Sequence, residues 1–233
     1  SAHLRFVLPY VKGYLIPGST GDGWELDDRE TLDVVNFALR ESREYVMYLL
    51  LGVLKTDLAA MNRTLEWMIG ALQGVSGKSD VTDLLQRARV CGFTVCPPKG
   101  KTLSQEEIYS ALSEIMKRGF PTALYQLPQV TENEVAPGTF ERLTAVYPNL
   151  IFFKDSSGGD RIALSPADKG GVYLVRGAEG DYARWLKDTG GPYDGFLLST
   201  ANCFPEQLHG VIEKIEARDI PSASKISEKI SGV

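Results

Sequence analysis

The sequence is poor in the residues on which several common kinds of site depend. It has three cysteines, Cys91, Cys96 and Cys203, and two histidines, His3 and His209, among 233 residues. An odd number of cysteines in a chain of this length argues against a disulfide framework and predicts a reduced, cytoplasmic compartment. Two histidines are too few for a histidine-based metal site, so we expect no bound metal.

Long apolar runs and basic clusters are also missing. The longest apolar stretches, such as residues 45–53, are far too short to cross a bilayer, and no segment has the pattern of a signal peptide. The formal net charge is −5, and no run of Lys and Arg appears. We therefore expect neither nucleic acid nor a membrane as a partner. No Gly-x-Gly-x-x-Gly follows an apolar run, which argues against a dinucleotide-binding fold.

The chain instead alternates short apolar runs with longer helical patterns. Hydrophobic residues make up 43%, which is enough for one sizeable core. The expected strands are 11–17, 45–53, 93–96, 121–127, 150–154, 172–175 and 195–199. The expected helices are 4–11, 28–43, 61–72, 81–90, 105–117, 137–146, 182–187, 205–217 and 222–230. Runs that are apolar throughout are typical of parallel strands buried on both faces.

This alternation predicts an α/β protein, either a (β/α)₈ barrel of the TIM type or an open doubly wound sheet. A barrel needs eight strands, and seven are present. Because the chain opens on a helical pattern that leads into a strand, we expect the first βα unit to be absent from this sequence. Its absence would expose two strand edges, so the natural chain is expected to be longer. We expect one domain over 1–233, with the barrel over about 1–205 and C-terminal helices over about 206–233, cut short at their end.

Two polar residues end neighbouring apolar runs, where the active site of a parallel barrel lies. Lys154 follows three apolar residues. Burial there lowers the pKa of a lysine, and a neutral amine is the nucleophile that attacks a carbonyl. The alternative is a lysine that extends to solvent or pairs with Asp155. Tyr125 ends the preceding strand, where a phenol could transfer protons or could be a core tyrosine with a satisfied hydroxyl.

A third candidate is the turn Gly18-Ser19-Thr20-Gly21-Asp22, which follows the first expected strand. Its hydroxyls and backbone N–H groups could hold a carboxylate beside a helix start. The alternative is a simple turn with capping residues. Gly177, Glu179 and Asn202 follow later strands, and each alone is more typical of a turn or a cap.

Together, these segments resemble the family of dihydrodipicolinate synthase and N-acetylneuraminate lyase. The matching segments occur in order: 18–22, Leu-Tyr-Gln-Leu-Pro at 124–128, and Phe-Lys-Asp-Ser-Ser-Gly at 153–158. The resemblance extends over essentially the whole chain. It implies a (β/α)₈ barrel that needs no metal or organic cofactor and assembles as a homo-oligomer, a dimer or a tetramer.

The resemblance also implies roles for individual residues. A 2-keto acid, typically pyruvate, would form a Schiff base on Lys154, and Tyr125 would act as acid and base. Ser19 would relay a proton, and Ser19 and Thr20 would bind the carboxylate of the keto acid. The expected substrate-binding set also contains Gly18, Gly177 and Leu197. Such an enzyme is a class I aldolase or lyase, which makes or breaks a carbon–carbon bond to an aldehyde.

Two departures from the family pattern argue against dihydrodipicolinate synthase activity. Residues 97–102 contain no aromatic that could supply the second tyrosine of the synthase relay. Residues 129–131 lack the arginine that many synthases use for a dicarboxylate aldehyde. The favoured substrate is therefore a 2-keto-3-deoxy sugar acid or a similar compound. Two alternatives stay open: a dehydratase or hydratase that uses the same Schiff base, and a catalytically weak relative that binds keto acids.

Overall fold

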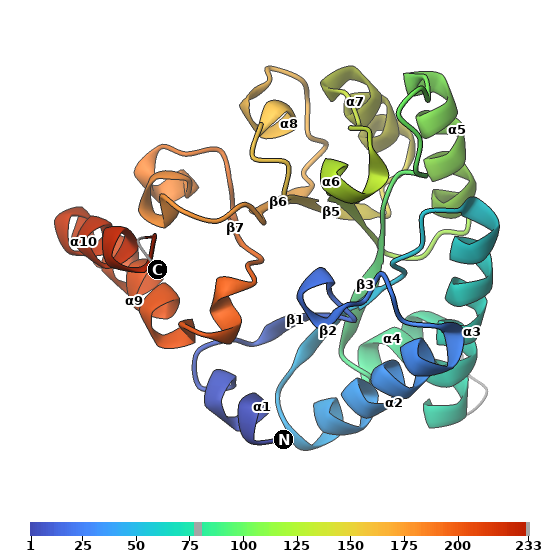
Figure 1. The fold of residues 1–233 in the computed structure, drawn as a ribbon, viewed down its shortest axis with the longest axis horizontal. Coiled ribbons are helices and arrows are strands. Elements are labelled where there is room, and N and C mark those ends of the chain that lie inside the picture. Colours follow the sequence, from blue (N-terminus) through green and yellow to red (C-terminus); the bar gives the residue numbers. More distant parts are fainter. Residues whose placement is uncertain (77–80, 232–233) are drawn as a thin grey trace.

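The computed structural model describes residues 1–76 and 81–231. In these residues, seven parallel strands form one curled sheet, in which each strand pairs with the next along the chain (Figure 1). They are β1 (Gly13–Ile16), β2 (Tyr48–Gly52), β3 (Val90–Val95), β4 (Thr122–Gln126), β5 (Leu150–Asp155), β6 (Tyr173–Arg176) and β7 (Gly195–Phe196). The strand count expected from the apolar runs is confirmed, and the sheet is a half-barrel.

Helices cover the outer face of this sheet (Figure 1). Two of them begin with capping boxes, at Asp27 with Glu30 and at Ser104 with Glu107, in which each side chain accepts from the other residue's backbone N–H. The helices are α1 (Ala2–Val7), α2 (Asp28–Glu44), α3 (Leu58–Ser76), α4 (Val81–Arg87), α5 (Gln105–Met116), α6 (Pro128–Thr131), α7 (Pro137–Val146), α8 (Arg161–Leu164), α9 (Pro205–Glu216) and α10 (Ile220–Ser231).

The main core lies between the sheet and these helices. Side chains alternate across a strand, so Leu49, Leu51 and Phe153 face the helices, whereas Leu50 and Lys154 face the inside of the curl. Burying each large apolar side chain contributes about 1.5–3 kcal/mol. The alternation at the end of β5 therefore places Lys154 in the concave interior and Phe153 in the core.

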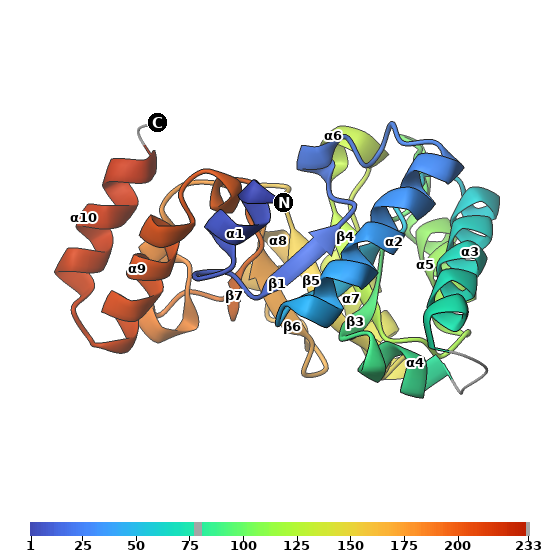
Figure 2. The same cartoon turned by 90° about the horizontal axis from the view of Figure 1, so that it is seen from below.

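A second, smaller core joins α9, α10 and the 3-10 turn η2 (Tyr182–Arg184). Figure 2 shows α9 and α10 packed together at the end of the molecule away from α3 and α5. Residues 232–233, at the end of the expected C-terminal helical region, lie outside the described residues. None of the helices in the described ranges has the length and apolar character needed to cross a membrane.

The sheet is open between its first and last strands. Within the described part of the chain, β1 and β7 each pair with one neighbour and not with each other. α1 and the residues after it contact the C-terminal part beside this opening: Nε2 of His3 lies 3.2 Å from Oδ1 of Asn202, and the rings of Tyr10 and His209 are 6.0 Å apart.

Several expected elements differ from the structure. The helix expected at 4–11 spans Ala2–Val7, because the chain turns at residues 8–10 before β1 begins. The helix expected at 182–187 is two 3-10 turns, η2 and η3 (Lys187–Thr189), because Leu186 is extended and bridges Tyr193. The strand expected at 195–199 ends at Phe196, since the chain then turns into η4 (Thr200–Asn202). The helix expected at 81–90 ends at Arg87, because β3 already begins at Val90.

Candidate active site

Lys154 and Tyr125 lie side by side at the C-terminal ends of β5 and β4. The two residues are register partners, so their side chains leave the sheet on the same, concave face. Nζ of Lys154 is 4.1 Å from the centre of the Tyr125 ring. The phenol and the amine are thus close enough to act on one bound molecule.

Lys154 is buried, with 9% of its surface exposed. Burial lowers the pKa of its ammonium group, and the interaction with Tyr125 and the charge of Glu179 oppose this shift only in part. Asp155 points to the helix-covered face, where its carboxylate accepts from the backbone N–H and the hydroxyl of Ser157 at 2.9 and 2.6 Å. Neither alternative for the lysine, extension to solvent or pairing with Asp155, is what the structure contains.

Gly177, directly after β6, leaves the space that the Lys154 side chain occupies. A Cβ at this position would lie 2.7 Å from Cε of Lys154 and 2.1 Å from Oγ of Ser156. Its backbone N–H donates to the carbonyl of Asp155 at 2.6 Å, which holds the two strand ends together. A larger residue would therefore displace the amine.

Ser19 connects Tyr125 to a residue that the sequence did not indicate, Trp24. Oγ of Ser19 lies 3.1 Å from the hydroxyl of Tyr125 and accepts from the indole Nε1–H of Trp24 at 2.8 Å. The Trp24 and Tyr125 rings are 6.1 Å apart. Ser19 belongs to the 3-10 turn η1 (Ser19–Gly21), which ends on Asp22 in the left-handed conformation. A tryptophan five positions after Ser19 is a weak sequence signal, because the direction of its indole depends on this turn.

A cavity of about 390 Å³ lies at the C-terminal ends of the strands. The lining contains Ser19, Thr20, Tyr125, Lys154 and Gly177 of the set expected from the sequence, together with Gln129, Ser156, Ser157, Glu179 and Ser199. Most of the polar groups are hydroxyls. The cavity thus offers hydrogen bonds around a buried amine.

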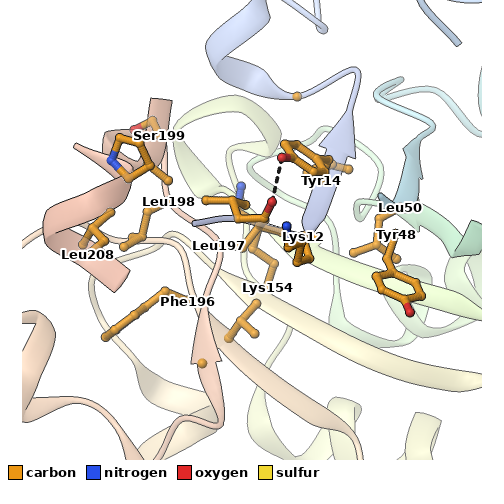
Figure 3. Close-up of a pocket in the computed structure, with 18 of the residues that line it drawn as sticks. Lys12, Tyr14, Tyr48, Leu50, Lys154, Phe196, Leu197, Leu198, Ser199 and Leu208 are labelled. Atoms are coloured by element: carbon orange, nitrogen blue, oxygen red, sulfur yellow. Dashed lines mark hydrogen bonds between the residues drawn. The ribbon is translucent and has the colours of Figure 1, made fainter. Parts of the chain in front are cut away.

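The other two expected residues, Gly18 and Leu197, lie on an adjoining opening of about 1190 Å³ between β1 and β7. Figure 3 shows Leu197 and its neighbours on one side of this opening and Tyr14 of β1 on the other, with Lys154 also among the lining residues. Tyr48 and Leu50 add apolar surface to the same opening. Lys154 is therefore reached from both spaces.

Glu179, beyond β6, is tied to the segment after β7. Its carboxylate accepts from the hydroxyl of Ser199 at 2.5 Å, from the backbone N–H of Thr200 at 3.1 Å and from the hydroxyl of Tyr182 at 3.0 Å. Although partial burial opposes the shift, these hydrogen bonds lower the pKa of Glu179. The sequence suggested a turn residue here, and the structure adds a negative charge that acts on Lys154.

A buried network of charged groups joins Arg176, at the end of β6, to Asp160, in the loop after β5. The guanidinium of Arg176 donates to both carboxylate oxygens of Asp160, at 3.0 and 3.3 Å, and to the carbonyls of residues 178–180. Tyr193 donates to Asp160 at 2.6 Å. Burial raises the pKa of the Tyr193 hydroxyl and the pKa of the neighbouring Asp155 carboxyl. Arg176 thereby links the loop that carries Gly177 and Glu179 to the loop after β5.

The described residues include no group of three or more His, Cys, Asp or Glu side chains arranged to hold a metal ion. Lys154, Tyr125 and the surrounding hydroxyls can instead support nucleophilic and acid–base chemistry.

The sequence is similar to that of known enzymes. Residues 74–233 match the model of the dihydrodipicolinate synthetase family. A 4-hydroxy-tetrahydrodipicolinate synthase of Stutzerimonas stutzeri is 27% identical over 162 residues, which are 67% of this chain and 54% of the relative. The chain thus spans about half the length of the curated relatives it matches.

Solved structures show the same fold at low identity. Dihydrodipicolinate synthase from Thermotoga maritima is 18% identical with a TM-score of 0.77, over 98% of this chain and 73% of that one. A 2-keto 3-deoxygluconate aldolase from Picrophilus torridus is 19% identical with a TM-score of 0.70, over 97% of this chain and 74% of that one. The resemblance first indicated by three ordered motifs is confirmed: the chain belongs to the dihydrodipicolinate synthetase family.

Proposed function

We propose that this protein is a class I aldolase or lyase in which Lys154 forms a Schiff base with a 2-keto acid, pyruvate in the simplest case. The observation that carries the proposal is a buried amine with a lowered pKa beside a tyrosine hydroxyl, in a cavity lined by hydroxyls. A lysine in this position is costly to maintain as a charged group and is suited to attack on a carbonyl.

The reaction would begin when the neutral amine of Lys154 adds to the ketone. Tyr125 then gives its proton to the departing hydroxyl, so that water leaves, an iminium forms and Tyr125 becomes a phenolate. In the cleavage direction, Tyr125 removes the proton of the substrate hydroxyl as the carbon–carbon bond breaks. The electrons of that bond pass to the iminium and form an enamine, and the aldehyde departs. Protonation of the enamine and hydrolysis of the iminium then release pyruvate and free Lys154.

The backbone N–H groups of Ser19 and Thr20 and the hydroxyl of Thr20 would bind the carboxylate of the keto acid. Both residues line the cavity beside Lys154, and Ser19 also contacts Tyr125. Gly177 would form the opposite wall, and Gly18 and Leu197 would lie at the edge of the adjoining opening. The keto acid would thus lie with its carbonyl carbon over Nζ and its carboxylate toward the β1 turn.

The lining favours a neutral, hydroxylated aldehyde as the second part of the substrate. Among its described residues, Lys154 and Glu179 carry charge, and Lys154 is consumed by the Schiff base. No second cation of this lining is then left to pair with an acidic aldehyde. The hydroxyls of Ser156, Ser157 and Ser199 and the amide of Gln129 match sugar hydroxyls, which supports a 2-keto-3-deoxy sugar acid or a similar compound.

The decisive experiment is borohydride reduction in the presence of pyruvate, followed by peptide mass spectrometry. We expect a stable adduct on Lys154, and none on a Lys154→Ala variant. Absence of an adduct in folded wild-type protein would refute the proposal. Product analysis with 2-keto-3-deoxy sugar acids then separates cleavage from loss of water, because a dehydratase would release no aldehyde.

A panel of aldehydes, each offered together with pyruvate, tests the substrate class. Synthesis from pyruvate should proceed with neutral hydroxylated aldehydes and be at least about tenfold slower with an aldehyde that carries a carboxylate, since an unpaired charge in the site is unfavourable. The opposite preference would contradict the substrate assignment while leaving the Schiff base in place. A homo-oligomer and a cytoplasmic location stay predictions, to be checked by sedimentation and by cell fractionation.

A further inference from the structure

We propose that Trp24 is a positioning residue that sets the direction of the hydrogen bonds from Ser19 to Tyr125. The proposal rests on the acid–base role of Tyr125 given above. Trp24 is not among the residues that line either cavity, so it would act through Ser19 and not on the substrate.

The argument begins with the hydrogen-bonding capacity of the two side chains. An indole N–H can donate and cannot accept, whereas a serine hydroxyl has one proton and two lone pairs. The 2.8 Å bond from Trp24 therefore occupies a lone pair of Ser19 and leaves the serine proton to be donated elsewhere. Either atom could be the donor in the 3.1 Å contact between Ser19 and Tyr125 when that contact is taken alone.

Trp24 favours one of these two directions. If Tyr125 donated to Ser19, both lone pairs of the serine would be used and its proton would need another acceptor. Among the hydrogen bonds of the described residues, Ser19 Oγ is joined to Trp24 and Tyr125 alone. The favoured arrangement runs from Trp24 to Ser19 to Tyr125, with each group donating to the next.

This direction matters for the proton that Tyr125 exchanges. When the Tyr125 oxygen accepts from Ser19, its own O–H is free to point into the cavity, where Lys154 and the substrate lie. A donated hydrogen bond also stabilises the oxygen when it gives up that proton. The indole of Trp24 cannot take up a proton, so this chain of hydrogen bonds ends at Trp24. Tyr125 therefore exchanges its proton on the side that faces the cavity.

The position of Trp24 is held by packing. Its ring is partly buried against the main core, 6.1 Å from the Tyr125 ring at an interplanar angle of 33°. Gly23 before it approaches the carbonyl of Gly18 and the side chain of Leu54 so closely that a Cβ would lie 2.7 and 2.8 Å from them. The packing of the ring and the tight turn at Gly23 therefore hold the indole in contact with Ser19.

The first test needs no catalysis. In the ¹⁵N-labelled full chain, the three tryptophans give indole N–H signals, and Trp24→Phe identifies the one that belongs to Trp24. Ser19→Ala should move this signal and speed its exchange with solvent, while those of Trp67 and Trp185 stay in place. An unmoved Trp24 signal would overturn the proposal.

The second test separates proton transfer from binding. Trp24→Phe keeps a ring beside Tyr125 and removes the donor, and Trp24→His restores a ring N–H. With pyruvate in D₂O, we expect methyl hydrogen exchange to slow about tenfold in Trp24→Phe, the order expected from one hydrogen bond. The Lys154 adduct at saturating pyruvate should persist, Trp24→His should recover much of the rate, and Trp67→Phe should behave as wild type.

Unchanged exchange in Trp24→Phe, or a Trp24→His variant as slow as Trp24→Phe, would show that the indole N–H has no such role. If wild-type protein forms no adduct on Lys154, the proposed function fails. The indole measurement with Ser19→Ala still decides whether Trp24 donates to Ser19.

Discussion

Nζ of Lys154 lies 4.1 Å from the centre of the Tyr125 ring, because β4 and β5 run parallel in a register that pairs these two residues. The contact places an amine with a lowered pKa beside a hydroxyl that can exchange protons. Ser19 and Trp24 extend this pair into a chain of hydrogen bonds on the far side of the phenol. Strand register is thus the direct structural origin of the candidate active site.

The pH dependence of adduct formation should reflect the buried amine. The pKa of Lys154 is lowered by burial from its ordinary value of 10.5, so its neutral fraction rises as pH passes through this lowered pKa. Initial rates of borohydride-trapped adduct with pyruvate should increase with pH and reach their plateau at a lower pH than those of a solvated lysine with a pKa of 10.5. A rate that keeps rising to pH 10.5 would indicate an ordinary, solvated lysine.

The same shift should affect stability. A lowered pKa means that the unfolded chain binds more protons than the folded one between the two pKa values, so the free energy of unfolding rises with pH across that window. At the acidic end of this pH window, the Lys154→Met variant should have a higher free energy of unfolding than wild type. The difference should shrink as pH rises through the window. Denaturant titrations over pH would measure this. A difference that grows with pH would contradict the assigned sign.

Tyr125→Phe should impair proton transfer more than keto-acid binding. The substitution keeps the ring over Lys154 and removes the hydroxyl, and general acid–base groups typically contribute 10²–10⁴-fold. We expect turnover to fall by about 10²-fold or more, while a pyruvate adduct on Lys154 still accumulates with time. Steady-state kinetics and trapping measure the two effects, and equal loss of both would assign Tyr125 to binding alone.

Gly177→Ala should displace the Lys154 side chain, because its Cβ would lie 2.7 Å from Cε of Lys154. We expect at least about a tenfold slower trapping by pyruvate, since small misplacements of reacting groups can cost up to about 10²-fold in rate. Gly138→Ala in α7 is the matched control, as nothing lies within 4 Å of its Cβ. Wild-type trapping in Gly177→Ala would mean that the cavity wall yields without moving the amine.

Asp160→Asn should be strongly destabilising. It leaves the buried guanidinium of Arg176 without its countercharge, and removal of one partner of a buried pair costs about 3–5 kcal/mol. Asparagine tolerates the left-handed conformation of this position, so the change isolates the charge. Glu106→Gln breaks an exposed pair with Arg142 and should leave the free energy of unfolding nearly unchanged. Similar small effects of both variants would contradict the structural role of the buried network.

Much of the fold could be predicted because the strands are short apolar runs between clear helical patterns. The seven strands and the positions of Lys154 and Tyr125 at strand ends follow from that pattern. The 182–187 segment was predicted wrongly as a helix, since its helical spacing is overridden by a bridge between Leu186 and Tyr193. The length of β7 was also overestimated, because the turn at 200–202 is a tertiary feature that apolar character does not reveal.

The family, the parallel βα order and the places of Lys154 and Tyr125 at strand ends follow from the amino-acid sequence alone, because apolar runs between helical patterns indicate buried parallel strands. Which of these residues meet depends on the tertiary structure. Ser19 and Tyr125 are 106 positions apart, and their contact depends on the curl of the sheet and on the turn after β1. The donor role of Trp24, the anchoring of Glu179 and the buried pair of Arg176 with Asp160 likewise depend on directions and distances that local sequence patterns do not specify.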